Sequence, residues 1–523
     1  MTNNKLLIKI IAYILLTSSV VSCTSIKELN YTVSEKKHQP ENLIKDVDFT
    51  YQLLKDGHPG LYWYINKEQL DYKFDSLKTT LTNPLTTKEF FKKLAPVVAQ
   101  VKCGHTKMLL VTKKLNKKEQ DSIKKLGVKP INQFSYKVVN NKLYVGSFNS
   151  SIKEVKKGNE IVAINEIPSQ DIINHIKQNI ASDGYNQTFK SASINRSFTS
   201  FYTTFYDNID LVNFKIKNEK DSIIELKLNT YKKPLVKDSV AIKKKTKQEK
   251  STEKKIAKAK QKLNYKGYDE LKNPILDLKF LEKDSSVAYL KVKSFSFPYA
   301  NFERFFKESF IALKKGETKD LILDLRDNGG GSLKACRNLF SYLVAKDFVY
   351  LQQTEVDRKF NPYSYGKGFI NGYKSFSFNL FSSVILKGEK NGKYKVNYKG
   401  IKPLPANANH FNGKVYVLIN GYSFSAAALL AANLQGIKRA TFVGQETGGG
   451  YNGCVAGRIP VIDLRNSKLK LRMGLYQILP NTHTDQIGRG IFPDVEITTT
   501  IEDIVAGKDN ELDWVLKEIK KKV

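Results

Sequence analysis

Cysteine and histidine are scarce in this chain of 523 residues, which contains four cysteines and six histidines. The cysteines do not form the dense pattern of a disulfide-stapled secreted domain. Their spacing relative to the histidines does not match a zinc site either, and we expect neither a metal nor another cofactor. The chain also lacks a second long apolar run after its N-terminus, so no transmembrane helix is expected beyond that point.

Acidic side chains are outnumbered, with 51 Asp and Glu against 86 Lys and Arg, which gives a net charge of +35. Such a charge is typical of nucleic-acid binders, but much of it is local, because residues 231–262 hold thirteen lysines against three acidic residues. The stretch "KKKTKQEKSTEKKIAKAKQK" has no arginine for base contacts and no aromatic side chain for stacking. We therefore expect no nucleic-acid partner and a solvated Lys-rich insert over 231–265; contact with anionic lipid or envelope polymer is the alternative.

The N-terminus has the features of a secretory signal: two lysines, a short apolar run over 6–16 and small residues before Cys23. "VVSC" resembles the lipobox of bacterial lipoproteins. That resemblance implies a signal peptide over 1–22, lipid on Cys23, a tether over 23–41, and a periplasmic or outer-membrane location in the cell envelope. An ordinary signal peptide is the alternative. The apolar run is too short to be a comfortable permanent anchor.

Three further regions follow, which differ in pattern. Helical spacing with a break at 57–60 predicts a helical domain over 42–118. Alternating short strands, one helix and the hairpin "NFKIKNEKDSIIELKLN" predict a β-rich domain over 119–230. Within it, "GNEIVAINEIPSQDII" resembles PDZ domains, which capture peptides by strand addition; a generic β-rich domain is the alternative.

The region 266–523 alternates apolar strand patterns with helical patterns. We expect strands in "SSVAYLKVKSF", "DLILDLRDN", "KVYVLIN" and "RATFVGQ", and helices in "NFERFFKESFIALKKG" and "SLKACRNLFSYLVA". This alternation predicts an α/β domain with a partly parallel sheet.

Two glycine- or serine-rich turns in this region could carry chemistry. "DLRDNGGGS", 324–332, can aim backbone N–H groups at an oxyanion or phosphate, although it is not a Walker loop and could be a plain tight turn. In "GYSFSAAALLAAN", 421–433, Ser425 sits at a helix N-terminus, where a nucleophile gains from free amides. We expect Ser423 to cap that helix; two structural serines are the alternative.

A serine nucleophile needs a base, and His105 in "KCGHTK" is the candidate because histidine titrates in the required range. A locally satisfied structural histidine is the alternative. His58, in "GHPGLYW", reads as a structural corner. A cysteine hydrolase using Cys103 is a further alternative, although that thiol lacks a helix N-terminus.

The order of these motifs, from "HPGLY" and "CGHT" through "LILDLRDNGGG" and "ATFVGQETGGG" to "GRGIFPDVEI", resembles the C-terminal processing (tail-specific) serine peptidases in their tricorn-core-like branch. The resemblance implies an α/β fold with a crotonase-like catalytic core, an N-terminal helical domain and a PDZ-like domain. It also implies hydrolysis of peptide bonds in unfolded or C-terminal protein segments.

By position, the resemblance makes Ser425 the nucleophile, His105 the general base, and the backbone N–H groups of Ala426 and Gly330 the oxyanion donors. Where the serine–lysine branch has its lysine, this chain has Gly450, which favours His105.

The tricorn-like branch also orients its histidine through a serine before it and a glutamate near the last motif, but this chain has Gly104 and Ile487 there. Glu446 and Asp485 are the candidate orienting residues. The departure leaves a second hypothesis open, a catalytically inactive peptide-binding lipoprotein. A Ser425–His105 separation of about 3 Å would favour the enzyme.

Overall fold

The computed structural model describes residues 26–148, 152–232, 251–252, 255, 265–269, 272–366, 369–388 and 391–521. The predicted signal peptide, Cys23 and most of the predicted Lys-rich insert lie outside these residues. Across the described part of the chain, no helix has the length and apolar character needed to cross a membrane.

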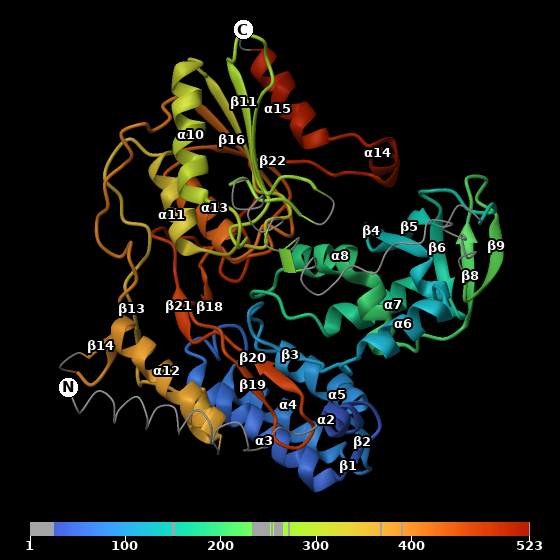
Figure 1. Ribbon diagram of the computed structural model, residues 1–523. Helices are drawn as coiled ribbons and strands as arrows, with labels where there is room; N and C mark the ends of the chain where they lie inside the picture. The colour runs from blue at the N-terminus through green and yellow to red at the C-terminus, as the bar shows by residue number, and fades with distance from the viewer. Residues whose placement is uncertain are drawn as a thin grey trace.

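The N-terminal region is helical, as predicted, and lies at the lower end of the molecule in Figure 1. Its elements are α2 (Ile26–Ser34), β1 (Lys37–His38), α3 (Pro40–Gly57), α4 (Lys67–Thr79), β2 (Leu85–Thr86) and α5 (Thr87–Ala99). Helix α5, which leads toward His105, begins at a capping box in which Thr86 and Glu89 satisfy each other's backbone N–H groups.

The prediction of a tether over 23–41 is wrong from Ile26 onward. Helix α2 and strand β1 are ordered, and Val33 and His38 are buried. The side chain of Asn30 both accepts from the backbone N–H of Lys114 at 2.8 Å and donates to its carbonyl at 2.9 Å. These long-range bonds, which no local pattern encodes, tie the segment to the domain.

An antiparallel sheet in the order β4-β5-β6-β8-β9, with β7 paired to β6, forms the predicted β-rich region. Its hairpin β8–β9 and helix α7 lie where the sequence predicts them. The elements are α6 (Lys117–Leu126), η1 (Pro130–Asn132), β4 (Phe134–Val139), β5 (Lys142–Phe148), β6 (Glu160–Ile164), β7 (Ile167–Pro168), α7 (Ser169–Gln178), α8 (Thr188–Phe205), β8 (Leu211–Lys217) and β9 (Ile223–Asn229).

A six-stranded sheet, β10-β11-β12-β16-β17-β22, is the centre of the C-terminal region; β10 is antiparallel to β11 and the other pairs are parallel. The prediction of a partly parallel α/β sheet is confirmed. The elements are β10 (Leu276–Phe280), β11 (Val287–Val292), α10 (Phe302–Lys315), β12 (Asp320–Asp324), α11 (Leu333–Ser341), β16 (Lys414–Ile419), α13 (Ala426–Gly436), β17 (Thr441–Gly444), β22 (Val495–Glu496), α14 (Ile501–Ala506) and α15 (Asn510–Lys520).

Both faces of this sheet are covered, because its strands are apolar on both sides. Along β12, Leu321 and Leu323 belong to the core shared with α10, α11 and α13, whereas Ile322 faces α15 (Figure 1). Strands β12 and β16 are parallel neighbours, so their carboxyl ends lie at one edge. The glycine loop after β12 and Ser425 after β16 therefore meet there, which is the usual ligand edge of an open α/β sheet.

The remaining elements join this sheet to the N-terminal helices. Strand β20 pairs with β3, just after His105, and Leu471 of β20 is buried among residues of α3 and α5. The hydrophobic core of the helical region thus includes residues from beyond 266, the position at which the sequence predicts the start of the C-terminal domain. The elements are β3 (Lys107–Leu109), β13 (Thr354–Val356), η2 (Pro362–Tyr365), α12 (Phe369–Ile385), β14 (Leu386–Gly388), β15 (Tyr394–Val396), β18 (Cys454–Ala456), β19 (Val461–Asp463), β20 (Lys470–Arg472) and β21 (Tyr476–Ile478).

Candidate active site

Ser425 occupies a strained turn between β16 and α13. Its φ of 56° and ψ of −122° lie in a region that non-glycine residues rarely adopt. It is itself the N-cap residue of α13, but its hydroxyl makes no capping hydrogen bond. Such a backbone conformation costs of order 1–3 kcal/mol. It leaves the Ser425 hydroxyl half-buried and without a hydrogen bond to its own helix.

Ser423 does not cap the helix, contrary to the prediction. Its buried hydroxyl donates to the carbonyl of Leu325 at 2.8 Å and accepts from the N–H of Asn420 at 3.1 Å. Helix α13 starts directly after Ser425, where the sequence places its N-terminus, and Ser423 instead fastens the serine turn to the loop after β12.

His105 lies beside Ser425, with 3.0 Å between His105 Nε2 and Ser425 Oγ. The imidazole stacks on Phe424, with 4.8 Å between ring centroids. The Nη1 of Arg472, on β20, donates to the His105 carbonyl at 2.8 Å. Two residues that are 320 positions apart in the chain therefore meet through the pairing of β3 with β20.

The His105 ring is buried, with 3% of the residue exposed. Burial, together with the positive charges of Arg472 and Lys107 and the charge that His58 gains only at low pH, lowers the pKa of His105 to about 3. The ring is therefore neutral at pH 7, which leaves one nitrogen able to accept a proton.

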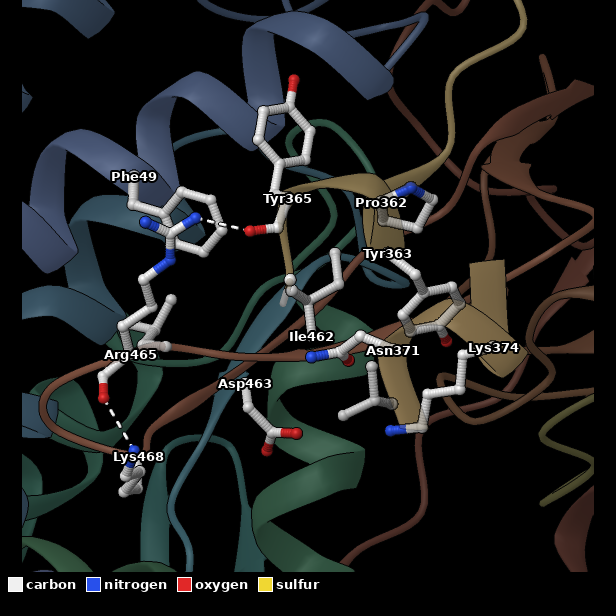
Figure 2. Close-up of a pocket in the computed structure, with 13 residues that line it drawn as sticks. Phe49, Pro362, Tyr363, Tyr365, Asn371, Lys374, Ile462, Asp463, Arg465 and Lys468 are labelled. Atoms are coloured by element: carbon white, nitrogen blue, oxygen red, sulfur yellow. Dashed lines mark hydrogen bonds between the residues drawn. The ribbon is translucent and has the colours of Figure 1, made fainter. Parts of the chain in front are cut away.

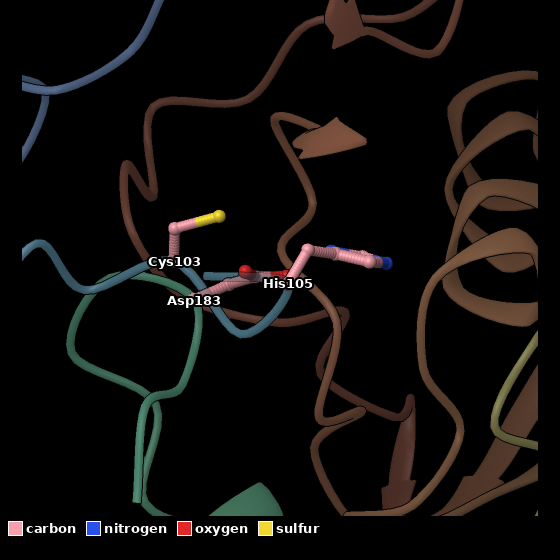
Figure 3. Close-up of side chains that lie close together, drawn as sticks. All are labelled: Cys103, His105 and Asp183. Atoms are coloured by element: carbon pink, nitrogen blue, oxygen red, sulfur yellow. The ribbon is translucent and has the colours of Figure 1, made fainter. Parts of the chain in front are cut away.

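The second ring nitrogen, Nδ1, is buried and finds no hydrogen-bond partner among the described residues. Asp183 lies close by: one oxygen of its carboxyl, one ring nitrogen of His105 and the Cys103 sulfur are all within 4.8 Å of one another. Figure 3 shows this carboxyl on the Cβ side of the imidazole, while the far end of the ring points away from it.

The Asp183 carboxyl is 3% exposed and is held by two backbone groups. The N–H of Gly104 donates to Oδ1 at 2.8 Å, and the N–H of Gly450 donates to Oδ2 at 3.3 Å. Burial raises the pKa of Asp183 to about 6 although these two bonds oppose the rise. One carboxyl thus joins the "CGHT" loop to the glycine loop that follows β17.

Neither residue predicted to orient His105 contacts it. The carboxylate of Glu446 is bound by Arg489 at 2.7 and 3.0 Å and by the N–H of Gly490 at 2.7 Å, so it stabilises its own loop. Asp485 is exposed on the surface. Both residues were chosen because they lie near the family motifs in the sequence, but neither carboxylate is close to the imidazole in the structure.

The two backbone N–H groups predicted to bind the oxyanion differ in their hydrogen bonding. Ala426 is the first residue of α13, where a backbone N–H has no acceptor within the helix. The N–H of Gly330, in contrast, donates to Asn328 Oδ1 at 2.9 Å, so the prediction that it faces an oxyanion is wrong in this structure. The Gly330 backbone still packs closely: a Cβ there would lie 2.6 Å from Ser425 Cβ.

A cavity of about 110 Å³ opens beside Ser425 and Ala426. Small residues, including Gly331 and Gly449, line one part of it. Its large side chains are apolar (Leu333, Leu429, Ile459 and Ile478), and Asp183 is the ionisable carboxyl among its lining residues. Such a cavity next to a nucleophile suits one apolar side chain of moderate size.

Cys103, His105 and Asp183 bring together sulfur, nitrogen and oxygen donors of the kinds that bind zinc. They do not fit a metal site. Both oxygens of Asp183 accept backbone hydrogen bonds, and the Cys103 thiol donates to the carbonyl of Val455 at 3.6 Å. Burial raises the pKa of Cys103 to about 11, so it is neither a ready ligand nor the thiolate that a cysteine hydrolase needs.

Larger cavities lie elsewhere among the described residues. One of about 490 Å³, shown in Figure 2, is lined by Phe49, Tyr365 and Arg465, and the Arg465 guanidinium donates to the Tyr365 carbonyl at 2.6 Å. Another of about 630 Å³ is lined by His58 and Trp63. Burial lowers the pKa of His58 to about 4, and neither of its ring nitrogens finds a partner among the described residues. Neither cavity is lined by Ser425 or His105.

Sequence reasoning missed Asp183. It follows helix α7 in "ASDGYNQ", which reads as an ordinary turn, and Gly184 adopts the positive φ of 56° that such a turn requires. No local pattern marks this aspartate, because its role depends on loops about 80 and 270 residues away in the chain.

Comparison with known proteins places this geometry in context. Mature CPAF complexed with lactacystin is 14% identical, with a TM-score of 0.58 over 92% of this chain and 98% of that chain. Mature CPAF alone is 15% identical, with a TM-score of 0.55 over 89% and 94%. At such identities the likeness establishes a shared fold. A search of curated proteins finds no match.

Residues 286–497 match the model of peptidase family S41. The match runs from β11 to just beyond β22 and includes the glycine loop, Ser425 and Ala426, whereas His105 and Asp183 lie outside it. The chain thus contains a region similar to peptidase family S41, and it has a mixed α/β fold like that of CPAF.

Proposed function

We propose that this protein is a serine endopeptidase of the C-terminal processing type, in the tricorn-like branch. The observation that carries the proposal is the 3.0 Å approach of His105 Nε2 to Ser425 Oγ, within hydrogen-bond reach of a general base and its nucleophile. The S41 match over 286–497 supports hydrolysis of peptide bonds.

In the acylation step, Ser425 Oγ attacks the carbonyl carbon of the scissile bond while His105 Nε2 takes the hydroxyl proton. The carbonyl oxygen becomes an oxyanion, to which the N–H of Ala426 donates from the start of α13. We assign the second donor to the backbone N–H of Gly331. The β-bridge between Gly331 and Phe295 is made by the Gly330 carbonyl and the Ser332 N–H, so it does not use the Gly331 N–H.

Collapse of this intermediate breaks the C–N bond, and the protonated His105 returns its proton to the leaving amine. A water molecule then attacks the acyl-enzyme with His105 again as base, which releases the new carboxyl end and restores the Ser425 hydroxyl. Protons and bonds balance over the cycle without a cofactor.

The substrate in this proposal is a peptide or an unfolded protein segment. The apolar cavity beside Ser425 supports cleavage after residues with apolar side chains of leucine or valine size. The antiparallel sheet, whose outer strands are β4 and β9, supports a PDZ-like role in which a substrate end adds as a further strand. The parallel sheet with α13 supports a crotonase-like core.

The lipoprotein assignment also belongs to this proposal. Lipid on Cys23 would place the peptidase at the cell envelope, and because α2 begins at Ile26, the tether between lipid and folded protein would be short. Labelling of cells with a radioactive fatty acid, compared between wild type and Cys23→Ala, tests it: the label should be lost in the variant.

The enzyme is tested by incubating the soluble mature chain with an unstructured protein that has a free C-terminus, and by identifying products by mass spectrometry. Wild type should cut after apolar residues. Ser425→Ala and His105→Ala should each lower the rate by about a thousandfold or more, since each removes a member of the reacting pair. A wild type as inert as both variants contradicts the proposal.

A further inference from the structure

For His105 to act as base, the proton on its neutral ring must sit on Nδ1. Only then is Nε2 free to accept the hydroxyl hydrogen of Ser425 across the observed 3.0 Å. A buried Nδ1–H without an acceptor costs roughly 1–3 kcal/mol, which would favour the wrong tautomer. The ring is 3% exposed, so bulk water does not solve this problem.

We propose that Asp183 is the residue that positions His105, by accepting the Nδ1 proton through one bridging water. The proposal rests on the proposed function, because it assumes that Ser425 and His105 react together. Asp183 would be a positioning residue and would not touch the substrate carbonyl.

The distance fits one intervening water. A ring nitrogen of His105 and an Asp183 oxygen lie at most 4.8 Å apart, and Nδ1 has no direct hydrogen-bond partner among the described residues. Two hydrogen bonds of about 2.8 Å that meet at a water's angle span about 4.6 Å. In Figure 3 the Asp183 carboxyl lies on the Cβ side of the ring. Nδ1 is bonded to the ring carbon that carries Cβ, whereas Nε2, at the far end, reaches Ser425.

The other charged groups that influence His105 cannot replace Asp183. Arg472 and Lys107 are donors without an acceptor, and both lower the pKa of His105. His58 is neutral at pH 7, and it disfavours the charged His105 ring only at low pH, where His58 itself is protonated. The neighbouring carboxylate predicted from sequence, Glu446, is occupied by Arg489.

The carboxyl of Asp183 is held in place by the Gly104 and Gly450 amides, so it does not have to be ordered when substrate binds. Its other titratable neighbours, Tyr64, Cys103 and Cys454, have raised pKa values through burial and stay neutral at pH 7. Asp183 is therefore the negative charge of this cluster once it ionises.

The first test compares kcat and KM of wild type with Asp183→Asn, using a peptide identified by the cleavage experiment. The variant should lose about a hundredfold in kcat and much less in KM, because Asp183, although it also lines the cavity beside Ser425, acts on the reaction through His105. Wild-type kcat/KM should rise with pH through a step near 6, where Asp183 ionises, and the variant should lack this step.

Cys103→Ala is the matched control, because it alters the same buried cluster and leaves the carboxyl intact. It should keep the pH step and most of kcat. A variant Asp183→Asn with kcat within threefold of wild type and the same pH step would overturn the inference while leaving the peptidase proposal intact.

A second measurement does not depend on catalysis or on the variant's folding. Nitrogen NMR of histidine-labelled wild type, with the His105 signals assigned by their loss in His105→Ala, reports which ring nitrogen carries the proton. We expect Nδ1–H at pH 7.5. A proton found on Nε2 overturns the positioning role, whereas an inactive wild type with Nδ1–H contradicts the enzyme proposal alone.

Discussion

At the scale of single residues, burial disfavours the charged forms of the ionisable side chains in the site. Burial moves the pKa of Asp183 up to about 6 and helps to move that of His105 down to about 3. Between these values both groups are neutral, so the two shifts act on stability in opposite directions as pH changes.

The direction in which each group changes stability with pH follows from the difference between its folded and unfolded pKa. The folded pKa of Asp183 exceeds its ordinary 3.8, so its contribution to stability is full below about pH 4 and is lost as pH rises through 6. The folded pKa of His105 lies below its ordinary 6.5, so its contribution is present above about pH 6.5 and is lost as pH falls toward 3.

We predict that two variants reveal these opposite slopes in thermal melting. From pH 4.5 to 7.5, the melting temperature of wild type should fall by about 3 °C relative to Asp183→Asn and rise by a similar amount relative to His105→Gln. Any constant cost of each substitution cancels in this comparison. Two differences that change with pH in the same direction would contradict the assigned shifts.

At the scale of elements, the loop after β12 is fastened to α15 by Arg326. This guanidinium bonds Asp324 at 2.9 Å, Asp509 at 2.6 Å and Glu511 at 3.3 Å. Burial alone would raise the pKa of Asp324, but Arg326, aided by Lys291 and Tyr289, lowers it to about 2. The loop that presents Gly331 thus depends on the C-terminal helix.

Replacement of this anchor should affect both stability and catalysis. Arg326→Gln leaves Asp324 buried with its main partner removed, which typically costs about 3–5 kcal/mol. We expect a lower melting temperature and a reduced kcat, measured by calorimetry and peptide cleavage. Arg304→Gln is the matched control: its pair with Glu308 is exposed, and such pairs contribute less than about 1 kcal/mol. Equal losses in both variants would contradict the assignment.

Individual elements were the part that the sequence could predict. Strands β11, β12, β16 and β17 and helices α10 and α11 form where apolar patterns place them, because both faces of a parallel sheet demand continuous apolar runs. Helix α2 was missed, since its anchoring bonds reach Lys114. Ser423 was assigned to the wrong role because its hydroxyl donates to the Leu325 carbonyl, far away in the chain, and not to its own helix.

At the scale of the whole molecule, the site joins three distant parts of the chain. Ser425 comes from the α/β sheet, His105 from the end of the helical region, and Asp183 from the loop between α7 and α8. Sequence could nominate Ser425 and His105 by residue type and motif. It could not nominate Asp183, or predict that Gly330 donates to Asn328, because these depend on how the parts pack.

The pairing of β20 with β3 is the link that this packing depends on. Leu471, fully buried on β20, belongs to the core of the helical region. Leu471→Ala should lower stability by about 2–5 kcal/mol and reduce kcat as His105 loses its register opposite Ser425. Leu380→Ala, at a residue 62% exposed on α12, is the control and should change neither. Melting temperature and peptide cleavage measure both effects; unchanged kcat in a destabilised Leu471→Ala would contradict the link.

The β3–β20 pairing also orders events during synthesis. A ribosome delivers the chain from its N-terminus, so His105 and Asp183 emerge long before Arg472, whose strand holds the His105 loop in register. A nascent chain that already contains Ser425 still lacks the strand that aligns its base. If the proposed peptidase is correct, its activity would therefore arise only after nine-tenths of the polypeptide has been made, and the growing chain would be protected from self-cleavage until the fold closes.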